Sequence, residues 1–134
     1  RLSDLEKRRR LAAARIFCAP SIHGESFGVV LLEAMAAGAA IVASNLSGYS
    51  LVARADRDAL LVDPRDVTAL AAGLNRVLDD PELHGALVAS GRRRAEEFSM
   101  DHLAERYVDL YDRVTTPARP SRGWRSPRSR RSAG

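Results

Sequence analysis

The chain has 134 residues, of which 46% are hydrophobic, enough for one buried core. Its longest apolar run, which begins at Phe27, is interrupted by Glu33 and by glycines and is too short for a membrane span. A single cysteine, Cys18, excludes an internal disulfide and a cysteine-based metal cluster. We expect a cytoplasmic α/β domain in which Cys18 is a small core residue or, as the alternative, a free thiol near a ligand cleft.

The formal net charge of +4 is unevenly distributed. Residues 115–134 hold six arginines and no acid, whereas the first 114 residues carry 15 basic and 17 acidic side chains. The terminal segment is rich in Pro, Ser, Gly and Arg and cannot supply a buried core. We expect residues 1–114 to fold and residues 115–134 to form a disordered tail, either inert or weakly attracted to an anionic membrane or to RNA.

Helical and strand patterns alternate along the folded part. Leu2 to Ala14 predicts a charged amphipathic helix, with Ser3 as its cap and Glu6 three residues later. The expected strands are 15–19, 40–43 and 59–62, and the other expected helices are 27–38, 49–53, 67–79, 81–98 and 100–114.

Strands separated by helices imply parallel pairing with right-handed crossovers. Three strands make only about half of a doubly wound domain. The first strand is therefore expected to lack its neighbouring strand and to present an exposed edge. Ligands in such sheets bind beyond the carboxyl ends of the strands, where residues 20–26 and 44–49 fall. Asn45 to Tyr49 therefore either lines a ligand site or forms a plain turn.

Glu33 stands alone in the apolar helix expected over residues 27–38. An ionised side chain is costly there unless something pairs with it. Glu33 therefore has a partner within the fold, or it faces a polar cleft and accepts hydrogen bonds from hydroxyl groups. Ser26 is the expected cap of this helix, and Glu33 projects from nearly the same side about 10 Å further along the axis.

The start of this helix has the features of an anion site. Gly28 allows a ligand to approach the backbone, and the free amides of Ser26 to Val30 lie at the positive end of the helix dipole. If a phosphate binds at this helix start, Glu33 is placed to receive a diol on one side of it and Glu25 is placed to reach a group on the other side. This is the layout expected for a sugar nucleotide. An ordinary helix with a serine cap explains the same residues. The arginine runs 8–10 and 92–94 are expected to be solvated helix faces, because acids lie nearby.

The segment Gly24 to Gly38, followed by Ala40 to Ser44, resembles the Glu-x7-Glu segment of retaining GT-B glycosyltransferases of family 4. The run Phe17 to Pro20 and the sequence Gly-Glu-Ser-Phe-Gly are most similar to the phosphatidylinositol mannosyltransferases and their relatives. The similarity continues through residues 60–64, 91–95 and 98–99 to about Val114.

This resemblance implies the nucleotide-sugar-binding, C-terminal part of a GT-B Rossmann-like domain. It assigns Glu33 to the ribose hydroxyls of the donor and Glu25, the catalytic candidate, to the transferred sugar. It also assigns the binding of sugar and diphosphate to the loop residues Ser26, Phe27, Gly28 and Val29. The basic pair for the diphosphate and the acceptor domain with its catalytic histidine would lie upstream of Arg1, so this chain alone is expected to be inactive. His23 is not expected to replace that histidine.

The implied reaction is transfer of a hexosyl group with retained configuration to a lipid or glycan acceptor, and GDP-mannose is the leading donor. No cofactor and no metal are implied. A UDP- or ADP-sugar is an alternative donor, because the residues that read the base lie mostly outside the motif. An alternative from another class is a non-catalytic sugar-nucleotide-binding fragment with a basic tail that binds nucleic acid or a membrane. A lipid acceptor is compatible with peripheral association at the inner membrane face, whereas nucleic acid is not an expected partner of the enzyme.

Overall fold

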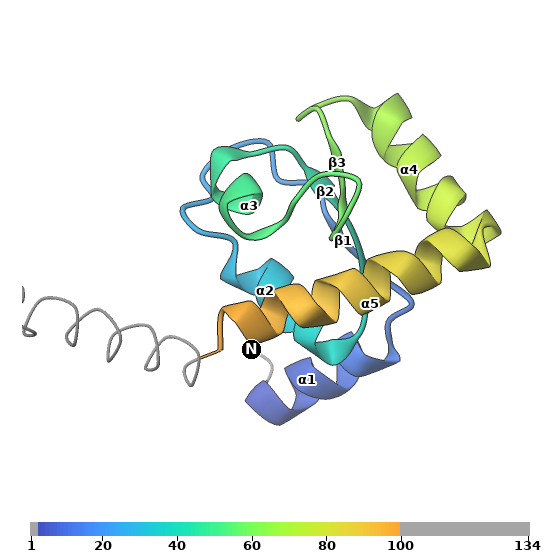
Figure 1. Ribbon diagram of the computed structural model, residues 1–134. Coiled ribbons are helices and arrows are strands. Elements are labelled where there is room, and N and C mark those ends of the chain that lie inside the picture. Colours follow the sequence, from blue (N-terminus) through green and yellow to red (C-terminus); the bar gives the residue numbers. More distant parts are fainter. Residues whose placement is uncertain (1–2, 100–134) are drawn as a thin grey trace, which may run out of the picture.

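The computed structural model describes residues 3–99, which form an α/β arrangement with a short parallel sheet (Figure 1). The helix expected over 100–114 and the tail expected over 115–134 lie outside the described residues. The elements in chain order are α1 (Asp4–Ala13), β1 (Ile16–Ala19), α2 (Val29–Ala37), β2 (Ala40–Ser44), α3 (Ser47–Val52), β3 (Leu60–Val62), α4 (Val67–Asp79) and α5 (Pro81–Glu97).

The three described strands are parallel and lie in the order β1-β2-β3, as the alternation of elements predicts. Central β2 is buried along its whole length, since both of its faces are covered by helices. Strand β1 lies at an edge, also as expected. The expectation that Cys18 is a core residue is wrong: its side chain is exposed on this edge strand.

Two apolar clusters cover the two faces of β2. On one face, α1, α2 and α3 pack around Ile41 and Ala43 with buried Leu31, Met35 and Tyr49. On the other face, Val42 packs with side chains of α4 and α5; this cluster includes Leu60, Val77 and Leu87. Helix α5 crosses the molecule diagonally (Figure 1) and contributes to both clusters, so it joins the two faces.

Side-chain caps explain where several helices begin. Ser3 accepts a hydrogen bond from the Glu6 amide at 3.2 Å, which confirms the expected start of α1. Asp66 caps α4 through the Ala69 amide at 2.8 Å. Asp80 caps α5, whose first residue is a proline preorganised for that position. Among residues 3–99, no helix is both long enough and apolar enough to cross a membrane.

Candidate functional site

The loop that joins β1 to α2 ends at Gly28, which has a φ of 82° and precedes the first helical residue, Val29. The expectation that Ser26 caps this helix is therefore wrong. The reason lies in α3, which packs behind the loop. A Cβ atom on Gly28 would lie 2.9 Å from Cγ2 of Val52 and 3.0 Å from the carbonyl oxygen of Gly48. Only glycine satisfies both this left-handed backbone and the lack of space.

The Glu25 carboxylate folds back onto this loop. Its Oε1 accepts a hydrogen bond from the Gly28 amide at 2.8 Å and a longer one from the Phe27 amide at 3.4 Å. These two amides are thus occupied, contrary to the expectation that all amides from Ser26 to Val30 are free. Val29 and Val30 begin the helix, so no intrahelical carbonyl lies before their amides. The loop therefore already holds one carboxylate at the position expected for an anion.

Helix α3 holds the loop in place from behind. Gly48 packs so closely on the backbone of Glu25 and Ser26 that a Cβ atom there would clash with the Glu25 carbonyl group. Buried Tyr49 adds a hydrogen bond between its hydroxyl and Oγ of Ser21 at 3.2 Å. The segment after β2 thus lies against the loop after β1, as the parallel topology predicts.

Glu33 lies in the middle of α2 and pairs with Lys7 of α1, whose Nζ is 2.7 Å from its Oε1. The Glu33 side chain is 38% exposed, so it is partnered and still accessible to solvent. The hydrogen bond with Glu33 raises the pKa of Lys7 above its ordinary value. Lys7 is the partner that an ionised residue in an apolar helix requires.

The Glu33–Lys7 pair borders a groove of about 530 Å³ between α1 and α2. This volume is within the usual range for a small-molecule site. Charged groups of both signs lie beside alanines, so the groove offers hydrogen-bond donors, acceptors and apolar surface together. Its lining residues are Asp4, Lys7, Arg8, Leu11, Ala12, Glu33, Ala36 and Ala37.

The other residues singled out by the sequence are spread over the loop and the helices. Ser26, Phe27, Val29 and His23 are exposed. Asn45 is exposed as well, and its Oδ1 accepts a hydrogen bond from Ser50 at 3.3 Å. A second hollow of about 100 Å³ lies at the carboxyl ends of the strands; it includes Pro20, Ile22, Ser44 and Val62.

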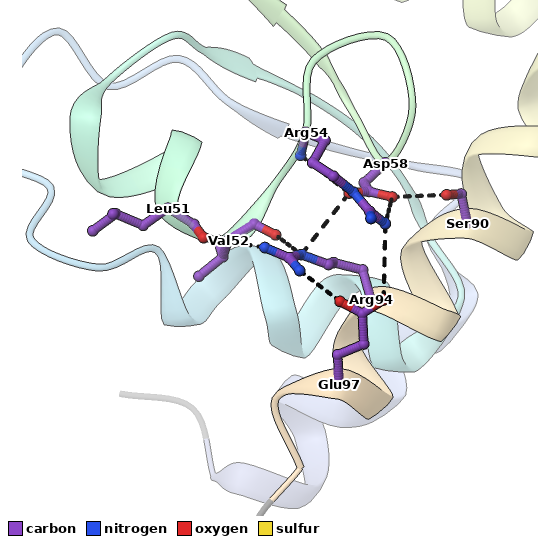
Figure 2. A network of polar contacts seen from close by, with 7 residues as sticks. All are labelled: Leu51, Val52, Arg54, Asp58, Ser90, Arg94 and Glu97. Carbon is purple, nitrogen blue, oxygen red and sulfur yellow. Dashed lines mark hydrogen bonds and ion pairs between the residues drawn. The ribbon is translucent and has the colours of Figure 1, made fainter. Parts of the chain in front are cut away.

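The arginine run 92–94 is only partly a solvated face, which corrects the expectation for it. Arg92 packs against Gly38 at the end of α2, and Arg93 is exposed. The Arg94 side chain is only 19% exposed and lies in a polar network with Asp58 (Figure 2). In the other run, Arg8 lines the groove and Arg10 pairs with Glu6 at 2.9 Å.

A parallel α/β sheet, a loop that leads into a helix at the carboxyl edge of the sheet, and a charged groove beside that helix are features of the nucleotide-binding class of α/β domains. The sequence model described as "Glycosyl transferases group 1" matches residues 1–94. The chain belongs to this glycosyltransferase family, and its fold is that of the GT-B enzymes.

Relatives and solved structures agree with this assignment. The chain is 37% identical over 115 residues to a phosphatidyl-myo-inositol mannosyltransferase of Mycolicibacterium smegmatis, a match that covers 85% of this chain and 30% of the relative. It is 42% identical over 115 residues to the MMP alpha-(1->4)-mannosyltransferase of Mycolicibacterium hassiacum, covering 84% of this chain and 28% of the relative. The structure of a sucrose-phosphate synthase from Thermosynechococcus elongatus superposes with a TM-score of 0.68 at 34% identity, covering 78% of this chain and 26% of the other. The chain thus spans about a third or less of the length of these proteins.

Proposed function

We propose that the chain forms the donor-binding part of a retaining glycosyltransferase, which transfers a hexosyl group from a nucleotide sugar to a lipid or glycan acceptor. GDP-mannose is the donor we favour, because both of the relatives described above are named mannosyltransferases. The observation that carries the proposal is the position of Glu33. Its carboxylate borders a groove large enough for a nucleoside and remains partly exposed.

The Glu33 carboxylate is suited to hold a ribose diol, since an ionised carboxylate accepts hydrogen bonds from two hydroxyls at once. Lys7 holds this carboxylate from the α1 side through one of its three donors. Both side chains are about 40% exposed, so the pair is weak and a ligand can share it. The base and ribose then occupy the groove between α1 and α2.

The diphosphate belongs at the start of α2, near the amides of Val29 and Val30 and the positive end of the helix. A diphosphate that also reached the amides of Phe27 and Gly28 would compete with the Glu25 carboxylate for them. Released from these amides, Glu25 would be free to contact the transferred sugar. The role of the chain is then to position the donor and to stabilise charge on the leaving diphosphate.

The test compares two carboxylate variants by calorimetry with GDP, UDP and ADP as separate ligands. Glu33→Gln keeps the shape and loses a charged acceptor, so we expect affinity for the preferred diphosphate to fall about 10- to 150-fold. Glu25→Gln should leave this affinity unchanged or raise it slightly, because its proposed contact is with the sugar and its carboxylate competes with the diphosphate for the Phe27 and Gly28 amides. Glu96→Gln, at an exposed position on α5, is the matched control. Equal and small effects at Glu33 and Glu96 would contradict the proposal.

A further inference from the structure

Arg94, in the last turn of α5, caps the end of α3. Its Nε donates to the carbonyl oxygen of Val52 at 2.8 Å, and its second terminal nitrogen donates to that of Leu51 at 3.3 Å (Figure 2). These are the last two residues of α3, whose carbonyls have no partner within the helix. A guanidinium at this end also complements the negative pole of the helix. Arg94 therefore fixes α3 to α5.

The guanidinium of Arg94 is held in turn by two acids. Nη1 pairs with Glu97 at 2.5 Å, and Nε lies 4.0 Å from the carboxylate of Asp58. Asp58 is fully buried. It accepts three hydrogen bonds from Arg54 and a fourth from Ser90 at 2.7 Å. The network thus contains two cations and two anions. Figure 2 shows its members converging from the end of α3, the loop after it and α5.

Two sets of contacts, here called routes, connect Arg94 to the loop that carries Glu25. The first runs through α3, because Val52 packs beside Gly28 and Gly48 packs on the backbone of Glu25. The second runs through an aromatic pair. The Arg94 Cζ lies 4.7 Å from the centroid of the Phe98 ring, and this ring makes an edge-to-face contact with Phe27 at 6.0 Å.

From these two routes we infer that Arg94 is a positioning residue for the loop Glu25–Gly28: it sets the orientation of the amides and of the carboxylate that the donor meets. The inference rests on the proposed function, because it gives the loop a ligand. Arg94 touches no part of the groove lined by Lys7 and Glu33. Its effect on binding is therefore indirect, through α3 and Phe27.

The first experiment needs no ligand. In the 134-residue chain, Arg94→Lys keeps the charge and loses the planar fork that reaches both carbonyls. We expect amide hydrogen exchange at Gly28 to accelerate about tenfold, while the amides of β2 exchange as in the parent chain. The matched control is Arg93→Lys, which changes an exposed neighbour on the same helix and should leave Gly28 unchanged. Equal acceleration at Gly28 and throughout β2 would reduce Arg94 to a general stabilising role and overturn the inference. No acceleration at Gly28 would overturn it too.

The second experiment measures affinity for the nucleoside diphosphates at a temperature where all variants are folded. We expect Arg94→Lys to weaken binding about three- to tenfold and Arg93→Lys to leave it unchanged. Faster exchange at Gly28 with unchanged affinity would overturn the link to the donor. If the parent chain binds none of the three diphosphates, the proposed function fails, and hydrogen exchange still decides whether Arg94 positions the loop.

Discussion

Lys7 and Glu33 form the contact on which the proposed donor site depends. Their 2.7 Å ion pair joins α1 to α2 at the edge of the groove, with both side chains about 40% exposed. Ion pairs this exposed contribute little to stability. The pair is therefore better explained by its place beside the groove than by a need to hold the helices together.

Replacing Lys7 by methionine tests this interpretation. Methionine keeps much of the length of the side chain and removes the charge. We expect the thermal midpoint to stay nearly unchanged and the affinity for the preferred nucleoside diphosphate to fall, because Glu33 loses the group that orients it. Differential scanning calorimetry and titration calorimetry on the same samples give both quantities. A large fall in the midpoint with unchanged affinity would show that the pair is structural.

Gly48 provides a second test at the scale of a residue. Gly48→Ala would drive a Cβ atom into the Glu25 carbonyl group, whose backbone cannot move without the loop. We expect a loss of about 1–3 kcal/mol in the free energy of unfolding, measured by urea denaturation. Gly85 is the matched control, since nothing lies within 4 Å of its Cβ position in α5. Gly85→Ala should stabilise the chain by up to about 1 kcal/mol. Equal effects at the two positions would contradict the close packing of α3 on the loop.

At the scale of the elements, Asp58 joins the loop after α3 to α5. Burial alone would raise the pKa of this carboxyl, but hydrogen bonds from Arg54 and Ser90 outweigh burial and hold the pKa below its ordinary value of 3.8. Arg94 and Glu97 are the other charged groups in the network. Since the pKa is lower in the folded chain, the stability from Asp58 is present above about pH 3.8 and is lost as the pH falls through the folded value.

Asp58→Asn tests this linkage. We expect the variant to lose roughly 3 kcal/mol at pH 7, because Arg54 keeps its charge beside a neutral partner. The difference in unfolding free energy between parent and variant should stay constant from pH 7 to about pH 5 and shrink below about pH 4. Urea denaturation at a series of pH values measures it, and subtraction removes the titration of other carboxyls. A difference that does not shrink in acid would contradict the lowered pKa.

Sequence patterns predict most elements well and the start of α2 poorly. Helix α4 has the expected bounds, Val67–Asp79, because its cap Asp66 and its breaker Pro81 are local signals. Helix α2 begins later than expected because Gly28 takes its conformation from α3, which lies 20 residues further on. The contacts of half-buried Arg94 are equally non-local: they depend on carbonyls of α3 that no spacing along α5 reveals.

At the scale of the molecule, β2 is the centre of the described part, with α2 on one face, α4 on the other and α5 joining both (Figure 1). This arrangement places the loop at the start of α2 between α3 and the C-terminal end of α5. It also leaves the groove between α1 and α2 accessible. The sequence motif assigns a ligand contact to Glu33, and this stays a prediction. The ion-pair partner of Glu33 and the groove required the fold, because α1 carries no part of the motif.

The most direct test of the proposed donor site is to map, by NMR, the contacts of GDP with the isotopically labelled 134-residue chain, and to repeat the experiment with UDP and ADP. We expect contacts from ribose protons to the side chains of Lys7 and Glu33, and shifts of the Val29 and Val30 amides from the diphosphate. Contacts confined to the second hollow, near Ser44 and Val62, would contradict the proposed position of the donor site. So would the absence of any ligand contact at Glu33 when the nucleotide is bound.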